Sequence, residues 1–390
     1  MSTATPATVR IYLVGGAVRD GLLGIPVHER DWVVVGATAG HLLARGYEAV
    51  DREFPVFRDP QTGDEYALAR RETKRGEGYR GFDVHTGPDV TLDEDLRRRD
   101  LTVNAMALSA DGTLIDPFDG RRDLDDGLLR HVSPAFDEDP VRVLRLARFA
   151  AKLGAFGFRV AHATHRLVKA MVERGDMVHL TAERVWREMV KAMATTQPWR
   201  FFEVLHACGA LAPLLPGLAD ALGPASPPHA RELPHALAAL RHVASVTTDP
   251  RLRIAATFAC CVDDAASADR LAAELRSDRE TAQLLRRTAI ARTLVERAAR
   301  ADVDALFELV RLWRGLDDRA AFDAAAVVAD AQYPHSGLRQ MLPLALQAVR
   351  GVSVDALRAG GVSGAELGTR LAAARRAAIS DALRAADLLT

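Results

Sequence analysis

Residues 11–20 read IYLVGGAVRD, a short apolar run that ends at two glycines and continues into Arg19 and Asp20. An apolar run of this length bounded by turn formers predicts a strand that enters a tight turn. DWVVVG at 31–36 is rich in β-branched residues, and DEYALAR at 64–70 alternates apolar and polar residues. Both patterns indicate further strands. The first 120 residues are therefore expected to form a small mixed sheet with helices, an α+β domain.

The rest of the chain has a different pattern. From Asp139 onward apolar residues recur with helical spacing, and Ala and Arg become frequent, which predicts all-α domains after the sheet. Turn formers in GPASPPHARELP, residues 223–234, interrupt this helical pattern and mark a domain boundary. Because 390 residues exceed what one ordinary core supports, we expect three domains, at 1–137, 138–220 and 221–390.

The composition is that of a globular protein, with 48% hydrophobic and 26% charged residues. A net charge of −1 provides no overall positive field, so any nucleic-acid surface has to be local. Cys208, Cys260 and Cys261 lack the spacing of a disulfide framework or a structural zinc site. No apolar stretch approaches the ~18 residues of a membrane span. These features predict a cytoplasmic protein without membrane association.

Two carboxylates stand at the start of the DWVVV run. Glu29 and Asp31 are two residues apart, so a strand directs both side chains to one face, where their oxygens suit a hard cation such as Mg²⁺. Metals held in this way activate a hydroxyl and stabilise leaving pyrophosphate in phosphoryl-transfer sites. Glu65, in another strand-like run, is a candidate third carboxylate. The alternatives are a charged strand edge for the pair and an ordinary exposed glutamate for Glu65.

Three further segments carry phosphate-binding chemistry. Glycines at 15–16 let backbone N–H groups approach a phosphate closely. LRRRDLTVNA, residues 96–105, supplies arginine forks that match phosphate oxygens. ARRETKRGEGYRG, residues 69–81, is expected to be a flexible basic loop that closes on polyanions. Each segment alone is also compatible with a plain turn or a solvated basic face.

The most informative segment is FDEDPVRVLRLARFAAKLG, residues 136–154. On an ideal helix five charged residues share one side, namely Glu138, Asp139, Arg142, Arg145 and Arg148. Leu146 and Phe149 fall within this charged arc, so we expect that side to be partly covered by other parts of the protein. Glu138 stands one turn before Arg142 and is expected to hold it through an ion pair.

The pair formed by Asp139 and Arg142 suggests how a base is selected. An acceptor beside a donor fork complements the Watson–Crick edges of cytosine and adenine. Guanine and uracil leave such a buried pair unsatisfied, at a cost of ~1–3 kcal/mol per group. The alternative is a surface helix with Asp139 as its cap and salt-bridged arginines.

In their order and spacing these segments resemble the bacterial class II CCA-adding enzymes of the nucleotidyltransferase superfamily. The matching stretches are GGAVRD at 15–20, the carboxylates at 29–31, EYALAR at 65–70, RRDLTVNA at 98–105, DPFDG at 116–120, EDPVRVLRLARF at 138–149 and LTAERVWREM at 180–189. The resemblance implies a metal-dependent enzyme that adds and repairs the 3′-terminal CCA of tRNA from CTP and ATP, releasing pyrophosphate and needing no obligate protein partner. The three domains are then a catalytic head, a base-recognising neck and a tRNA-binding body and tail.

The resemblance also implies residue roles. Gly16 and Arg19 are expected to contact the nucleoside triphosphate, and Asp139 and Arg142 to read the base edge. Phosphate, sugar or base contacts are expected from Arg99, Arg145 and Arg148. Glu183 and Arg184 are expected to brace the helix that carries the base-reading pair.

The chain departs from the family pattern at two places. Glu29 replaces the usual first aspartate of the metal strand. FACCVDD at 258–264 stands where relatives often carry the His-Asp pair of a metal phosphohydrolase, and His235 has no evident partner set, so we expect no hydrolase site. The arginine-rich segment at 275–300 is expected to contact tRNA. Alternatives are a poly(A) polymerase of the same superfamily, a catalytically silent RNA-binding relative, and an enzyme that adds only part of CCA.

Overall fold

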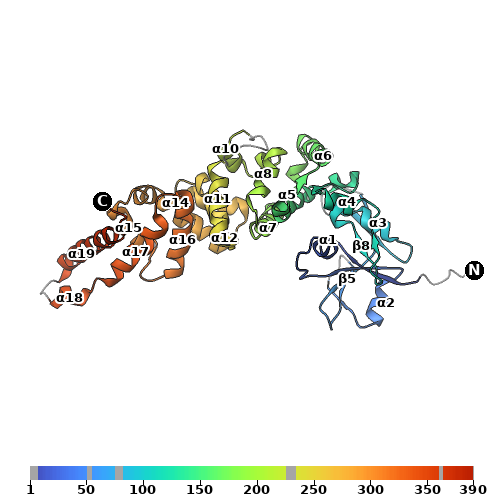
Figure 1. Cartoon of the computed structure of the whole chain (residues 1–390), viewed down its shortest axis with the longest axis horizontal. Coiled ribbons are helices and arrows are strands. Elements are labelled where there is room, and N and C mark those ends of the chain that lie inside the picture. The colour runs from blue at the N-terminus through green and yellow to red at the C-terminus, as the bar shows by residue number, and fades with distance from the viewer. Residues whose placement is uncertain (1–7, 51–54, 75–81, 225–233, 360–362, 390) are drawn as a thin grey trace, which may run out of the picture. The chain divides into compact units, whose positions relative to one another are not determined.

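The computed structural model describes residues 8–50, 55–74, 82–224, 234–359 and 363–389. The chain forms two compact units. The first consists of Met1–Leu180 with Cys208–Ala210, and the second of Thr181–Ala207 with Leu211–Thr390. Strands and helices alternate in the first unit, whereas the second is helical (Figure 1). The expected order, an α+β domain followed by helices, is confirmed, and the division into three domains stays a prediction.

A seven-stranded sheet organises the first unit, in the order β3-β4-β5-β2-β1-β8-β9. Its strands are β1 Arg10–Val14, β2 Asp31–Val35, β3 Glu48–Ala49, β4 Val56–Arg58, β5 Glu65–Leu68, β8 Ala107–Leu108 and β9 Leu114–Ile115. The β2–β5 pair is parallel and the other pairs are antiparallel. Val33 and Val34 of β2 pack into two different buried clusters. Since successive strand residues point to opposite faces, the sheet has apolar packing on both sides.

Helices and two small strand pairs complete the first unit. The α-helices are α1 Gly16–Leu22, α2 Ala39–Ala44, α3 Leu92–Arg97, α4 Gly120–Asp125, α5 Val141–Leu153 and α6 His162–Glu173. The 3₁₀ turns are η1 Thr102–Asn104, η2 Pro134–Glu138, η3 Gly154–Phe156 and η4 Asp176–His179. The small pairs join β6 Arg70–Lys74 to β7 Phe82–Thr86 and β10 Leu128–Leu129 to β11 Arg159–Val160.

The basic segment 69–81 differs from its prediction. Residues 70–74 form β6 instead of a loop, and 75–81 lie outside the described residues. Arg70 pairs with Glu72 at 2.8 Å and Arg71 with Glu94 at 2.7 Å. Strand pairing and nearby carboxylates therefore hold the described half of the segment in place.

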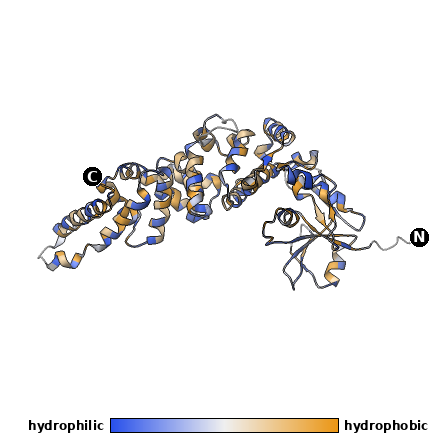
Figure 2. Ribbon diagram, in the orientation of Figure 1, coloured by the Kyte–Doolittle hydropathy of each residue, from blue (hydrophilic) through white to orange (hydrophobic). Residues whose placement is uncertain are grey.

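The second unit is built from helices that pack side by side along the chain (Figure 1). They are α7 Ala182–Met193, α8 Trp199–Ala207, α9 Leu211–Leu214, α10 Pro216–Leu222, α11 His235–Val246, α12 Pro250–Phe258, η5 Ala259–Cys261, α13 Ala265–Leu275, α14 Arg279–Ala298, α15 Val303–Leu312, α16 Arg319–Gln332, α17 Leu338–Gly351, α18 Val354–Ala359 and α19 Gly364–Ala385. Most carry both hydrophobic and hydrophilic residues (Figure 2). No helix among the described residues is long and apolar enough to cross a membrane.

Aspartates start several helices of the second unit. At five of them the N-cap carboxylate accepts a hydrogen bond from a backbone N–H of the first turn; these N-cap residues are Asp249, Asp264, Asp278, Asp302 and Asp318. Each such cap stabilises its helix by ~1 kcal/mol. The negative carboxylate also interacts favourably with the positive end of the helix dipole. Local sequence thus fixes where these helices begin.

Candidate functional site

The register of the central strands brings the glycine turn and two carboxylates together. In the antiparallel β1–β2 pair Val14 lies opposite Asp31, and in the parallel β2–β5 pair Asp31 lies opposite Glu65. Neighbouring strands are ~4.8 Å apart. Since Gly15 follows Val14 directly, the start of β2 has the glycine turn on one side and Glu65 on the other.

Asp31 lies in a charged environment. Burial raises the pKa of Asp31, and the carboxylates of Glu65 and Glu29 raise it further, whereas the Arg99 guanidinium lowers it. The four side chains are thus close enough to influence one another. A bound cation would relieve the repulsion among the carboxylates, and their oxygens are the ligands that hard divalent cations prefer. In chemical type, these carboxylate oxygens are suitable ligands for a divalent metal.

The three predicted carboxylates do not occupy equivalent positions. Asp31 begins β2, but Glu29 precedes the strand by two residues, so the expectation that one strand directs both to the same face is wrong. Glu65 accepts a hydrogen bond from Arg58 at 3.3 Å. Across the described residues, no group of three or more His, Cys, Asp or Glu side chains is placed to hold a metal ion. Metal binding by Glu29 and Asp31 stays a prediction.

Gly15 and Arg99 are packed against each other. Gly15 has a φ of +69°, and a Cβ atom there would lie 2.9 Å from a terminal nitrogen of Arg99. Arg99 donates to the Asn104 carbonyl at 3.4 Å and to Asp95 at 3.2 Å, while its buried Nε has no partner. The backbone angle therefore favours glycine, and a side chain at this position would displace the end of the Arg99 guanidinium.

Replacing Gly15 by alanine is expected to destabilise the fold by ~1–2 kcal/mol because of the left-handed backbone, and to lower nucleotide incorporation by displacing Arg99. Gly21→Ala in α1 is the matched control, since no atom lies within 4 Å of its Cβ position. Thermal unfolding and incorporation assays measure both variants. Equal behaviour of the two variants would contradict a positioning role for this contact.

Gly16 is the first residue of α1, and Arg19 lies one turn further along that helix. Arg19 is 2% exposed, and it donates to Asp20 at 2.8 Å and to the side-chain oxygen of Asn104. Internal partners thus hold the guanidinium that we expected at the triphosphate. Its contact with a nucleotide, like that of Gly16, stays a prediction.

A chain of polar contacts continues from Arg19 to α5. Asn104 donates to Asp100 at 3.0 Å, and Arg145 donates to the other oxygen of Asp100 at 2.7 Å. At the opposite end, Lys152 donates to Asp20 at 2.9 Å. Both ends of this series of contacts thus lie on α5. The contacts link α5 to α1, the helix that follows the glycine turn.

Asp100 is a buried anion in the middle of this chain of contacts. Burial would raise the pKa of Asp100, but the charge of Arg145 and hydrogen bonds from Asn104 and Arg145 outweigh it and hold that pKa well below its usual range. Asp20, Asp100 and Lys152 were not among the predicted site residues. The signal for the first two was their place within GGAVRD and RRDLTVNA.

The base-reading pair has defined partners at the start of α5. Asp139 is extended, with a φ of −127°, and its carboxylate accepts from the Val141 N–H at 3.1 Å. Arg142 is 9% exposed and donates to the carbonyls of Ala135 at 2.7 Å and Arg98 at 2.9 Å. These two carbonyls fix the rotamer of Arg142, in place of the expected ion pair with Glu138. Base reading by the pair stays a prediction.

The charged side of α5 is covered, as predicted. Leu146 is 1% exposed and Phe149 is 6% exposed. Three guanidinium carbons lie over the Phe149 ring, those of Arg148 at 4.5 Å, Arg19 at 5.1 Å and Arg145 at 5.7 Å from its centroid. Cation–π attraction contributes ~0.5–2 kcal/mol at such contacts. Phe149 therefore gathers three predicted nucleotide contacts around one ring.

The expected brace from LTAERVWREM lies in α7, which belongs to the second unit. Glu183 pairs there with Arg276 at 3.5 Å. Bracing of α5 by Glu183 and Arg184 stays a prediction.

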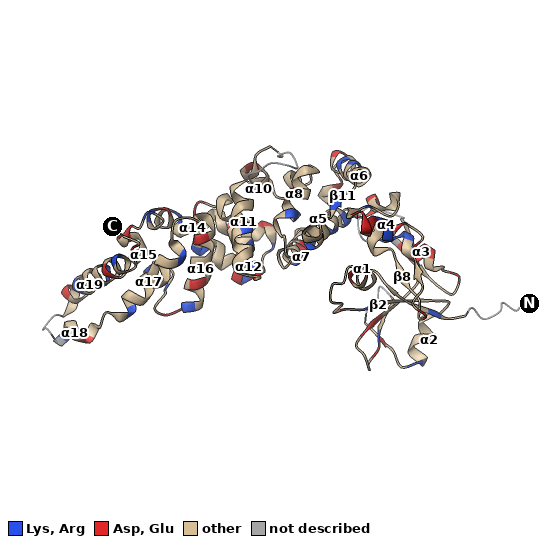
Figure 3. Ribbon diagram, viewed as in Figure 1, with Lys and Arg blue, Asp and Glu red and all other residues tan. Residues whose placement is uncertain are grey.

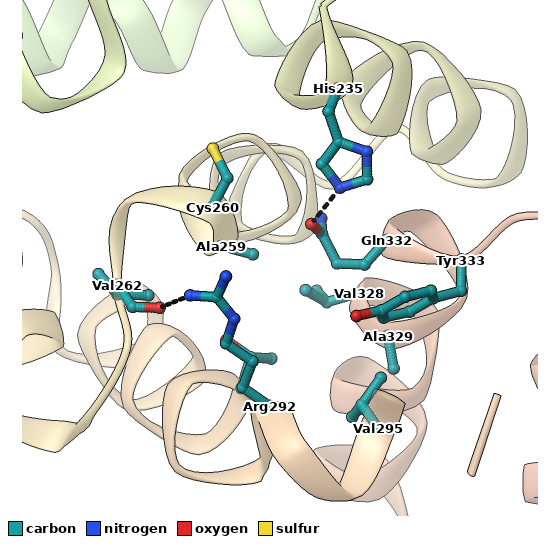
Figure 4. A pocket seen from close by; sticks show the side chains of 11 residues that line it. His235, Ala259, Cys260, Val262, Arg292, Val295, Val328, Ala329, Gln332 and Tyr333 are labelled. Carbon is teal, nitrogen blue, oxygen red and sulfur yellow. Dashed lines mark hydrogen bonds between the residues drawn. The ribbon is translucent and has the colours of Figure 1, made fainter. Parts of the chain in front are cut away.

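A cavity of about 90 Å³ occupies the second unit beside the FACCVDD segment (Figure 4). His235, Cys260, Arg292, Gln332 and Tyr333 line it, together with apolar side chains. His235 lies 3.2 Å from the Gln332 amide oxygen, and the Sγ atoms of Cys260 and Cys261 are 3.7 Å apart. The polar groups of the lining include an imidazole, a thiol, an amide, a guanidinium and a phenol, and no carboxylate stands beside His235 among the described residues of this lining. Absence of hydrolase activity stays a prediction.

Comparisons with known proteins agree with this geometry. The family model described as poly A polymerase head domain matches residues 11–130, and one described as a probable RNA and SrmB-binding site of polymerase A matches residues 157–222. A multifunctional CCA protein of Aromatoleum aromaticum is 55% identical over 265 residues, 67% of this chain and 64% of the relative. One of Vibrio vulnificus is 58% identical over 214 residues, 55% of this chain and 52% of the relative. The chain thus spans less than two thirds of these relatives' length.

Solved structures match nearly the whole chain. A tRNA-processing enzyme in an apo form has a TM-score of 0.65 at 26% identity, covering 95% of this chain and 93% of that chain. The Thermotoga maritima CCA-adding enzyme complexed with tRNA has a TM-score of 0.65 at 20% identity, covering 97% and 92%, which shows a shared fold. Together with the sequence relatives, these matches show that residues 11–130 belong to the poly A polymerase head-domain family and that the chain is similar to bacterial CCA-adding enzymes.

Proposed function

We propose that this protein is a template-independent nucleotidyltransferase of the cytoplasm that adds and repairs the 3′-terminal CCA of tRNA from CTP and ATP, with release of pyrophosphate. One observation carries the proposal: strand register places Asp31 between the glycine turn and Glu65. The sequence around this site belongs to the part of the chain that matches the poly A polymerase head domain. Offering labelled CTP and labelled ATP separately to tRNA that ends before CCA tests the proposal.

A divalent metal is part of the proposed mechanism, because enzymes of this superfamily generally use one. We propose Mg²⁺, held by carboxylate oxygens of Asp31 and Glu29. When bound, the metal activates the tRNA 3′-hydroxyl and neutralises charge on the phosphates.

Protein groups around the carboxylates position the nucleotide. Arg99 lies beside Gly15 and influences Asp31, so it is the cation best placed to meet a triphosphate. We assign sugar and base contacts to Arg145 and Arg148, which flank Phe149. Their anchoring on α5 supports a fixed pocket, because preorganised donors stabilise charge better than mobile ones do.

Base selection is proposed for Asp139 and Arg142. Asp139 precedes α5 in an extended conformation, and its carboxylate is an acceptor for the amino group of cytosine or adenine. Arg142 uses both terminal nitrogens on backbone carbonyls. These bonds use two of the five guanidinium N–H groups and fix the side chain, which leaves further N–H donors for a base.

A poly(A) polymerase is the second candidate, favoured by the match of residues 11–130 to the poly A polymerase head-domain family. Such an enzyme would share the carboxylates and arginines but incorporate only AMP. Incorporation of label from CTP separates the two candidates. Absence of any incorporation, with retained tRNA binding, would support a catalytically silent RNA-binding relative.

A further inference from the structure

Helix α6 has one buried and one basic face. Thr164, Val168 and Met171 are its buried residues. His162, Arg166 and Lys169 are exposed and follow one another at intervals of four and three residues, so they form one stripe on the helix surface. At ~1.5 Å rise per residue the stripe is ~10 Å long.

A further exposed basic residue, Arg159, precedes this stripe in the sequence. It is exposed on β11, three residues before His162. Within the described part of the chain, Arg159, Arg166 and Lys169 take part in no side-chain hydrogen bond or ion pair. Glu173 ends the stripe, and the next residue, Arg174, is already paired with acidic partners. We call the residues Arg159, His162, Arg166 and Lys169 the α6 basic face.

The arginines of residues 275–300, which include α14, differ from those of the α6 basic face in their ion pairing. This segment, residues 275–300, is the one that we expected to contact tRNA, and many charged residues mark it in Figure 3. Six of its arginines are ion-paired, in Arg276–Glu183, Arg286–Asp269, Arg287–Asp318, Arg292–Asp263, Arg297–Asp302 and Arg300–Glu296. Most of its positive charge is therefore neutralised within the protein.

The difference matters for binding a polyanion. A cation with solvent partners only can contact a phosphate and release a condensed counterion, which drives nucleic-acid binding. A cation already paired with a carboxylate must first exchange that partner, and the released carboxylate then repels the phosphate. Two segments with the same number of arginines can thus contribute unequally to RNA binding.

We infer that the α6 basic face is a contact surface for the phosphate backbone of RNA, and that α14 contributes less than its arginine count indicates. The inference rests on the proposed function, in which tRNA is the substrate. It assigns residues within a stretch, 157–222, that matches a probable RNA-binding family model. Contacts of this kind recognise the shape of a double-stranded stem and not its sequence.

The test compares two triple variants that remove the same charge. The first carries Arg159→Ala, Arg166→Ala and Lys169→Ala. The matched control carries Arg286→Ala, Arg292→Ala and Arg297→Ala, whose side chains are all ion-paired. Binding of full-length protein to tRNA lacking CCA is measured by fluorescence anisotropy over a range of KCl concentrations. Thermal unfolding confirms that both variants are folded.

The α6 variant is expected to raise the dissociation constant about tenfold or more and to reduce the salt slope by about two to three. The control is expected to stay within about twofold of wild type. Equal losses in both variants would show a general charge effect and overturn the inference. Unchanged tRNA binding by the α6 variant would also overturn the inference. That result is expected if this face binds an acidic protein and not RNA.

A turnover measurement separates this inference from the proposed function. At saturating tRNA the α6 variant is expected to incorporate CTP and ATP as wild type does, with only the KM for tRNA raised. Wild-type protein that binds tRNA but incorporates neither nucleotide would refute the proposed function. The binding comparison would still decide the role of the α6 basic face.

Discussion

Asp31→Asn is expected to lower CTP and ATP incorporation by about 10³-fold, equivalent to ~4 kcal/mol of transition-state stabilisation. The substitution preserves shape but removes the charged oxygen on which metal binding depends. Asp31 is the one predicted metal ligand that begins β2, with the glycine turn and Glu65 on its two sides. Binding of tRNA is expected to stay within about twofold, because the substitution leaves every other proposed RNA contact in place.

The stability of the fold should not fall with the activity in Asp31→Asn. The pKa of Asp31 is raised by burial and by Glu65 and Glu29, so its ionised form is disfavoured in the folded protein relative to the unfolded chain. At neutral pH this group therefore destabilises the fold, and the effect is relieved as pH falls through the raised pKa. Asp31→Asn removes it and is expected to unfold at the same or a higher temperature than wild type.

Glu48→Gln is the control for this experiment. Glu48 is an exposed carboxylate on β3 of the same sheet, and its loss is expected to leave incorporation unchanged. Single-turnover incorporation and thermal unfolding of both variants are the measurements. Wild-type incorporation by Asp31→Asn would show that the metal assignment is wrong.

Asp139→Ala is expected to change which nucleotide is used. Without the carboxylate, no acceptor penalises the carbonyl groups of uracil and guanine. A relief of ~1–3 kcal/mol corresponds to about a 5- to 150-fold gain in UTP use relative to CTP. Affinity for the triphosphate should stay within about tenfold, because the phosphate contacts are elsewhere. Competition assays with mixed triphosphates measure the change.

A second variant separates base reading from capping. Asp139 accepts from the Val141 N–H, so alanine also removes a cap. Asp139→Ser restores a capping oxygen but lacks the carboxyl carbon, the second oxygen and the negative charge. Selectivity should therefore be lost in both variants, and stability only in the alanine variant. An Asp139→Ala protein that rejects UTP as wild type does would refute the base-reading assignment.

Arg142→Ala behaves differently in this account. It should lower the use of both CTP and ATP and also destabilise the fold, because the carbonyls of Ala135 and Arg98 lose their donors. The two residues of the pair thus have separable roles, selection for Asp139 and a combined structural role for Arg142.

Local patterns predicted the parts of the fold that depend on local chemistry. The apolar runs at 11–14, 31–35 and 65–68 became β1, β2 and β5, since β-branched and alternating residues suit a pleated surface. Leu146 and Phe149 lie in the charged arc of α5 and are buried. In both cases the spacing of side chains along one element was sufficient.

Long-range contacts could not be predicted from spacing. The pairing of Asp31 with Glu65 depends on a parallel register between distant strands. Arg142 is held by the carbonyl of Arg98, 44 residues earlier, and backbone acceptors leave no signature in the sequence. The neutralisation of Arg286 by Asp269 likewise depends on how α13 and α14 pack. These contacts decide which arginines are available to a ligand.

Pyrophosphate released per tRNA tests the central claim most directly. For tRNA that ends before CCA, the account predicts three pyrophosphates per tRNA with CTP and ATP together, two with CTP alone and none with ATP alone. Unlimited release with ATP alone would identify a poly(A) polymerase. No release under any condition, by folded protein supplied with Mg²⁺, would contradict the account.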